Sequence, residues 1–193
     1  MEISSADVKN DQSMRMFLSF HVPEKISRGL LDEFVGLPVV PYPAENLHIT
    51  FKFIGEVLHQ DMETLKAVIS VIAEYGRPFQ FTPTHFSVEN DRLRLYLKTD
   101  PLLSTIQSAF SRELEKIPLG KKDENPYAPH ITLGKPLQGL DLAAVRVDLQ
   151  KYIFEISELG LYQSEQGQNQ TGVYTLLHAF VLGKDAHGAS VKK

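Results

Sequence analysis

The chain has 193 residues, 42% of them apolar, and a formal net charge of −4 at pH 7. This length and composition fit one globular domain, or two small lobes that share a core. A net negative charge disfavours a broad surface for long nucleic acids, because proteins that hold many backbone phosphates usually carry a basic excess. A small basic pocket for one or two phosphates remains compatible, because a local field can differ from the net charge.

Cysteine is absent, which excludes disulfides, a thiol nucleophile and thiolate metal sites. No apolar run reaches the roughly 18 residues of a membrane span, and the opening MEISSADVKNDQS lacks the apolar centre of a secretory signal. We therefore expect a cytoplasmic location. We also expect flexible tails at residues 1–13 and 184–193, flanking one bilobal domain over residues 14–183.

Strands and helices alternate along the first half of the chain. The apolar run Arg15–His21 predicts a strand, and the proline that follows it predicts a helix over residues 23–35. Leu47–Ile54 alternates like a strand. The spacing of apolar residues in Asp61–Tyr75 predicts a second helix.

The second half begins this order again. Its predicted elements are the strands Phe79–Val88 and Leu93–Lys98, a helix over 100–117, the strand His130–Lys135, a short helix over 140–149, and the strands Tyr152–Gln163 and Val173–Leu182. The approximate duplication predicts an α+β fold of two similar lobes, each an antiparallel sheet with helices. A pseudo-twofold axis is expected to relate the lobes around a central groove, which is a common place for a ligand.

The tripeptide His-Ile-Thr occurs in both halves, in ENLHITFKFIG and, 82 positions later, in NPYAPHITLGK. Residues two apart in a strand face the same way, so His48 and Thr50 share one face, as do His130 and Thr132. If the lobes are related by a pseudo-twofold axis, the two pairs converge on one space.

The neighbouring residues of the first copy follow the same alternation. Lys52 is expected next to Thr50 on the polar face, and Ile49, Phe51 and Phe53 are expected in the core.

Two facing imidazoles suit a reaction that needs a base and an acid together, because histidine titrates near neutrality. A phosphodiester fits this arrangement: one His takes a proton from the attacking oxygen, and the other gives a proton to the leaving oxygen. The Thr hydroxyls can donate to the non-bridging phosphate oxygens. A single His-x-Thr in a strand is most often ordinary packing, whereas two copies in matching strands favour function.

No cofactor or metal is required by this scheme. Ligation of a metal by His48 and His130 is a weaker alternative, because two imidazoles without a nearby carboxylate or a third His make a poor site.

The segments NLHITFKFIGEV and PYAPHITLGKP resemble the paired His-x-Thr-x (HxTx) motifs of the two-histidine (2H) phosphoesterases. Within that superfamily, MRMFLSFHVP and ISELGLYQSEQGQNQTGVYTLLHAFVL are similar to the opening and closing strands of the bacterial and archaeal RNA 2′,3′-cyclic phosphodiesterases, also called RNA 2′-5′ ligases. The resemblance spans about residues 14–183, nearly the whole chain.

The resemblance implies hydrolysis of a 2′,3′-cyclic phosphate to a 2′-phosphomonoester without a cofactor, and possible 2′-5′ RNA ligase activity in reverse. It implies that His48 is the proton donor and His130 the proton acceptor, and that Thr50 and Thr132 hold the phosphate. The motifs alone do not separate acid from base. RNA ends or small cyclic nucleotides are the expected partners, with no membrane and no obligate protein partner.

Two further residues are candidates for the site. Lys135 stands where the superfamily often carries Arg, five residues after the second His; it supplies a charge but not a bidentate fork, and alternation points it away from His130 unless the strand bends. Tyr127 lies in the loop before the second motif and is the better candidate for stacking a base, because Phe51 is expected in the core.

Two alternative functions remain. The first is a phosphodiesterase for another small nucleotide, such as a 2′-5′ oligonucleotide or a cyclic ADP-ribose phosphate, because the chemistry at phosphorus is shared. The second is a non-catalytic nucleotide-binding module, which the two intact His-Thr pairs disfavour.

Overall fold

The computed structural model describes residues 13–98, 100–117, 119, 126–166 and 172–183. The tails predicted at residues 1–12 and 184–193 lie outside the described residues. Ser13, placed in the first tail by the sequence, begins the first strand. No helix in the described part of the chain has the length and apolar character needed to cross a bilayer.

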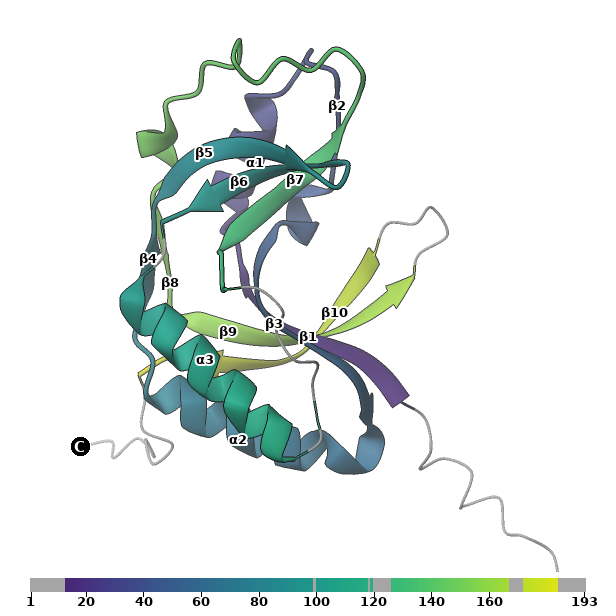
Figure 1. The fold of residues 1–193 in the computed structure, drawn as a ribbon, viewed down its shortest axis with the longest axis vertical. Helices are drawn as coiled ribbons and strands as arrows, with labels where there is room; N and C mark the ends of the chain where they lie inside the picture. Colours follow the sequence, from purple (N-terminus) through teal and green to yellow (C-terminus); the bar gives the residue numbers. More distant parts are fainter. Residues whose placement is uncertain (1–12, 99, 118, 120–125, 167–171, 184–193) are drawn as a thin grey trace, which may run out of the picture.

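One antiparallel sheet organises the molecule (Figure 1). Its strand order is β10-β9-β1-β3-β7-β6-β5, and a short strand β2 also pairs with β7. The strands are β1 (Ser13–His21), β2 (Val39–Pro41), β3 (His48–Leu58), β5 (Pro83–Glu89), β6 (Arg92–Leu97), β7 (His130–Pro136), β9 (Glu158–Gln166) and β10 (Gly172–Val181). A separate pair joins β4 (Phe79–Phe81) to β8 (Phe154–Ile156).

The helices are α1 (Glu24–Asp32), α2 (Met62–Glu74) and α3 (Pro101–Lys116), with short 3-10 turns η2 (Ala44–Asn46), η3 (His59–Asp61) and η4 (Leu149–Tyr152). The predicted α+β class is confirmed, because a few helices accompany a predominantly antiparallel sheet. The pseudo-twofold relation between whole lobes stays a prediction.

Helices of each half of the chain pack on strands of the other half. The end of α1 meets β5, where the Phe34 and Phe86 rings lie 5.1 Å apart edge to face. Conversely, α3 contacts β3, where the Phe110 and Phe51 rings lie 5.9 Å apart. Helices α2 and α3 also contact each other, and both lie in the lower part of Figure 1. This exchange ties the two halves into one core.

The two His-Ile-Thr strands meet at one pair of residues. Ile49 of β3 lies opposite Ile131 of β7, the only registered pair between these strands in the described residues, and both side chains are fully buried. The ladder of paired residues is therefore shortest between the two motif strands.

Alternation in β3 differs from the prediction after Thr50. Phe51 is buried as expected, but Lys52 is also buried and Phe53 is 59% exposed. The register against β1 slips in this stretch, because Phe17 pairs with Phe53 and Ser19 pairs with Thr50. A bulge adds one residue and reverses the faces that follow it, so the expectations for Lys52 and Phe53 were wrong.

Three other predicted elements also differ. The strand predicted at Tyr152–Gln163 begins in the last residue of η4 and divides into β8 and β9. The strand predicted at Phe79–Val88 divides at Thr82 into β4 and β5, and Pro83 is the first residue of β5, a position where the missing amide donor is tolerated. The helix predicted at residues 140–149 is a series of turns, in which Asp141 accepts a hydrogen bond from the Ala143 amide. The apolar residues of this segment recur mainly two apart and pack on the core without helical periodicity.

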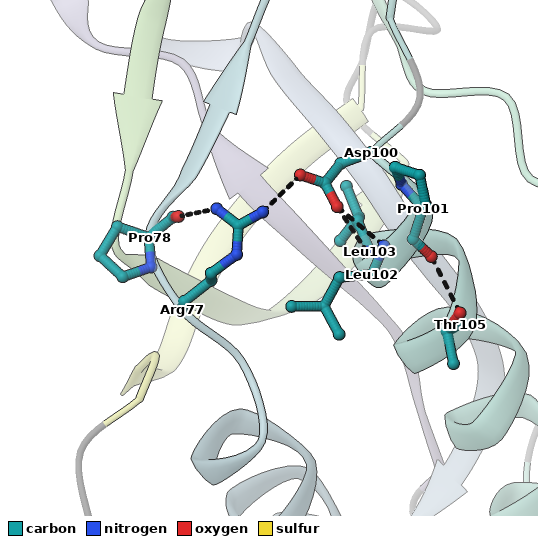
Figure 2. Close-up of polar contacts among 7 residues, drawn as sticks. All are labelled: Arg77, Pro78, Asp100, Pro101, Leu102, Leu103 and Thr105. Carbon is teal, nitrogen blue, oxygen red and sulfur yellow. Dashed lines mark hydrogen bonds and ion pairs between the residues drawn. The ribbon is translucent and has the colours of Figure 1, made fainter.

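The start of α3 is fixed by a capping carboxylate (Figure 2). One oxygen of Asp100 accepts hydrogen bonds from the amides of Leu102 and Leu103, at 2.8 and 3.3 Å. The other pairs with Arg77, which precedes β4, at 2.8 Å. Asp100 thus caps α3 and also links the start of this helix to the segment that precedes β4.

We expect the cap to contribute more stability than the ion pair, because surface ion pairs contribute about 0–1 kcal/mol and Arg77 is half exposed. Asp100→Ala is expected to lower the free energy of unfolding by about 0.5–2 kcal/mol, the usual effect of losing a cap. Asp100→Asn keeps the cap and should stay near the original value, as should Arg77→Met. Urea denaturation provides the measurement, and equal losses in the Ala and Asn variants would show that the charge dominates.

Candidate active site

A cavity of about 710 Å³ opens on the face of the sheet that carries both motifs. Its walls come from β1, β3, β6, β7, β9 and β10, together with the segment around η2. Strands on both sides of the β3–β7 pairing therefore contribute residues to the cavity.

His48, Thr50, His130 and Thr132 all line this cavity, as the alternation of their strands predicts. The registered pair Ile49 and Ile131 places the two motifs side by side, and His130 is near enough to His48 to affect its pKa. The structure thus brings the two His-Thr pairs to one cavity.

Each imidazole makes the same local hydrogen bond. Nδ1 of His48 lies 2.7 Å from the carbonyl oxygen of Asn46, and Nδ1 of His130 lies 2.9 Å from that of Ala128. A carbonyl only accepts, so Nδ1 donates in both rings and carries the proton of the neutral form. Nε2 is then the nitrogen that remains to exchange a proton in the cavity.

Burial lowers the pKa of both rings, because the charged imidazolium loses water. The carbonyl of Asn46 opposes the shift at His48, and the nearby His130 and His21 add to it. At His130, the carbonyl of Ala128 opposes the shift.

Two charged residues also act on the pKa of His130. The guanidinium of Arg94 lowers it and the carboxylate of Glu89 raises it, both by smaller amounts than burial. The ligand-free site therefore favours two neutral imidazoles.

Aromatic rings hold the two imidazoles in place. The rings of Phe17 and Tyr174 lie 5.3 and 5.2 Å from that of His48. The ring of Tyr96 lies 5.5 Å from that of His130. These contacts limit rotation of the imidazole rings, and both rings still line the cavity.

The cavity is locally cationic although the whole chain is acidic. Among the described residues that line it, Arg15, Arg92 and Arg94 carry positive charge and Glu165 carries negative charge, so 3 − 1 gives a local balance of +2. The chain as a whole carries −4. A cavity of this kind favours an anionic ligand.

Lys135 and Tyr127 are not brought to the cavity. Lys135 is exposed and pairs with Val40 of β2. The preceding Gly134 keeps β7 close to β2, because a Cβ there would lie 2.4 Å from the Val40 carbonyl oxygen. Tyr127 packs edge to face on Phe51, with ring centroids 6.1 Å apart, and burial raises its pKa.

Sequence reasoning did not identify the other cavity residues that carry aromatic or cationic groups, which are Arg15, Phe17, Tyr42, Phe53, Arg92, Arg94 and Tyr174. Phe53 reaches the cavity through the bulge in β3. Arg92 and Arg94 come from β6, where arginine alternates with leucine in RLRLYL. That alternation placed both arginines on one face, but it did not indicate that β6 is the neighbour of β7.

Within the described ranges, no group of three or more His, Cys, Asp or Glu side chains is arranged to hold a metal ion.

Comparison with known proteins gives relatives in sequence and in fold. No protein-family model matches this chain. A Methanocaldococcus jannaschii protein named RNA 2′,3′-cyclic phosphodiesterase is 28% identical over 174 residues, which cover 78% of this chain and 91% of that protein.

Solved structures share the fold. Escherichia coli LigT complexed with 3′-AMP has a TM-score of 0.72 at 19% identity, covering 90% of this chain and all of that one. The protein TT0787 of Thermus thermophilus has a TM-score of 0.70 at 22% identity, covering 88% of this chain and 98% of that one. These findings together support the two-histidine phosphoesterase superfamily for this chain.

The hydrogen bonds and the burial of the two imidazoles lead to a test by nitrogen-15 NMR. We expect His48 and His130 to titrate below the ordinary value of 6.5, with the proton of each neutral ring on Nδ1. The exposed His59 of η3 serves as a reference ring outside the cavity. A neutral ring protonated on Nε2, or a pKa above 6.5 in the ligand-free protein, would contradict this geometry.

Proposed function

We propose that this chain hydrolyses the 2′,3′-cyclic phosphate of an RNA end, or of a small nucleotide, to a 2′-phosphomonoester, without a metal ion. The observation that carries the proposal is the pair of imidazoles on adjacent strands, both held through Nδ1 and both lining one cationic cavity. The Methanocaldococcus relative, named for this activity, supports the choice of substrate.

In the proposed reaction, Nε2 of His130 accepts a proton from water while the water oxygen attacks phosphorus. The bond from phosphorus to the 3′ oxygen breaks, and Nε2 of His48 donates a proton to that oxygen. One water is consumed, and the product carries its phosphate on the 2′ oxygen. The assignment of acid and base follows the superfamily resemblance.

The lowered pKa values of the two imidazoles are compatible with one base and one acid once the substrate is present. Neutral His130 is the form that a base requires, and burial together with Arg94 favours it. His48 must carry a proton to act as the acid. The negative phosphodiester favours the protonated form of a nearby ring, so substrate binding offsets the effect of burial on His48.

The two threonines are the proposed donors to the non-bridging oxygens. Thr50 and Thr132 line the same cavity as the two imidazoles. Their hydroxyls thus flank a phosphate that lies between the rings. Donors fixed before reaction stabilise the charge that develops on phosphate oxygens.

Aromatic side chains that line the cavity are the proposed contacts for a nucleobase. Phe53 is 59% exposed and lies 6.2 Å from the Phe17 ring. Tyr42 and Tyr174 also line the cavity. Complexes of E. coli LigT with 3′-AMP, ATP and NADP+ support nucleotide binding in this fold.

The same acid-base pair could act with a second nucleophile. If the 5′ hydroxyl of another RNA replaces water, the product is a 2′-5′ linkage, and the reverse reaction cleaves such a linkage. This ligase activity is proposed as a side reaction of the same site.

The histidines are expected to act as one unit. His48→Ala and His130→Ala should each lower kcat by roughly two to four decades, the usual contribution of a positioned proton-transfer group. The double variant should lose much less than the product of the two losses. The pH profile of kcat/KM should be bell-shaped with its maximum below pH 6.5, because burial lowers both pKa values.

Turnover of nucleoside 2′,3′-cyclic phosphates measures these effects, with circular dichroism as the check on folding. His59→Ala is the matched control, because His59 is exposed and lies outside the cavity. Turnover near the original rate in either cavity variant, with the fold intact, would rule out the two-histidine mechanism.

The position of the product phosphate provides a separate test. Phosphorus NMR of the hydrolysed cyclic nucleotide should show the 2′-monophosphate, because His48 is proposed to protonate the 3′ oxygen. Activity should persist in excess EDTA. A clean 3′-monophosphate would reverse the roles or the substrate orientation, and loss with EDTA that zinc or manganese restores would replace the mechanism with a metal-dependent one.

A further inference from the structure

Arg94 lies beside the second motif on the cavity side of the sheet. It is opposite Thr132 in the register of β6 with β7, and it lines the cavity. Directly opposed residues of antiparallel strands project from the same face. The register slips between Leu93 and Arg94, and such an irregularity commonly redirects a side chain.

The Arg94 guanidinium is held by a carboxylate before any ligand arrives. Its Nη1 lies 3.1 Å from Oε2 of Glu89, and its side chain is only 19% exposed. The same carboxylate accepts the Tyr96 hydroxyl, 2.8 Å from both oxygens, and the Ser87 hydroxyl at 3.1 Å. The Tyr96 hydrogen bond lowers the pKa of Glu89 and keeps it ionised.

This arrangement leaves donors of the guanidinium for another partner. Arginine carries five N–H donors in a planar fork. Nε of Arg94 is buried and has no hydrogen-bond partner within the described part of the chain. Buried donors normally have partners, so the protein groups around Arg94 do not satisfy the whole guanidinium, and the residue lines the cationic cavity where a ligand oxygen can approach it.

The other cations near the site are placed differently. Lys135 is exposed and outside the cavity. Arg92 lies over the Tyr42 ring, 5.8 Å from its centroid, and donates to the hydroxyl of that tyrosine. Arg15, the third cation of the cavity, is registered with Glu56 of β3. Arg94 alone among these four is registered with a residue of the second motif.

We propose that Arg94, positioned by Glu89, binds a non-bridging oxygen of the substrate phosphate beside Thr132, a contact that Lys135 does not provide. This inference rests on the proposed function and names a further residue for it. A guanidinium held in place loses little conformational freedom on binding. Its planar fork can donate two parallel hydrogen bonds, which the ammonium group of lysine cannot. The contact also places positive charge where the phosphate oxygens gain negative charge.

The test compares Arg94→Met, Arg94→Lys, Glu89→Gln and Lys135→Met in the full chain. The first measurement is the Kd of inorganic phosphate by calorimetry; the second is kcat and KM for a nucleoside 2′,3′-cyclic phosphate. Arg94→Met should weaken phosphate binding and lower kcat/KM by roughly tenfold to a hundredfold each, the range for losing a charged hydrogen bond.

Arg94→Lys should recover part of both losses, because it restores the charge without the fork. Glu89→Gln should cause a smaller loss, since the arginine remains but is held less firmly. Lys135→Met should leave phosphate binding and turnover unchanged. Thermal unfolding checks that each variant is folded.

The outcomes separate this inference from the function on which it rests. If the original chain does not hydrolyse the cyclic phosphate, the proposed function fails, and the phosphate Kd values still decide the role of Arg94. The inference is overturned if folded Arg94→Met binds phosphate like the original chain, if Lys135→Met shows the loss instead, or if the original chain binds no phosphate. A purely structural ion pair would lower the stability of Arg94→Met and Glu89→Gln equally and leave phosphate binding intact.

Discussion

The pairing of Ile49 with Ile131 is the constraint on which the site depends. These fully buried side chains fix the register of the two motif strands at the one point where the strands meet. A shift of one residue in either strand would turn its His and Thr into the core and its isoleucine into the cavity, because side chains alternate between faces. Helix α3 packs close to this pair of isoleucines, since its Phe110 contacts the Phe51 ring two residues beyond Ile49. The apolar core thus sets the relative placement of the polar groups.

A second constraint acts on the orientation of each imidazole. The carbonyl two residues before each His accepts from Nδ1, so a local backbone feature repeats the same tautomer at His48 and His130. The chemical difference between the rings must then come from their surroundings. His48 lies among the Phe17 and Tyr174 rings, whereas His130 lies beside Arg94 and the Tyr96 ring. Two locally similar motifs therefore acquire different environments from neighbouring strands, which is how groups of the same type take different roles in acid-base catalysis.

Much of the site could be predicted from the sequence, because strand alternation is a local property. The period of two placed His48 with Thr50 and His130 with Thr132, and the structure brings all four to one cavity. What the sequence did not reveal depends on contacts between distant segments. The bulge that exposes Phe53 arises from the register of β3 against β1, and the position of Arg94 depends on β6 pairing with β7. The loop residue Tyr127 and the strand residue Lys135 are close to the motif in sequence, but core packing and pairing with β2 direct them elsewhere.

The charges that line the cavity and the burial of its histidines together determine the protonation state of the two imidazoles. Burial alone would leave both imidazoles neutral, a state with a base but no acid. At His130 the charge of Arg94 adds to the effect of burial. An anionic ligand reverses this balance, because it neutralises the arginines and interacts favourably with a proton on a nearby ring. The phosphate that we propose to bind in this cavity therefore also favours the protonated imidazole that acts as the acid. Binding of the anion and proton transfer are coupled in this way.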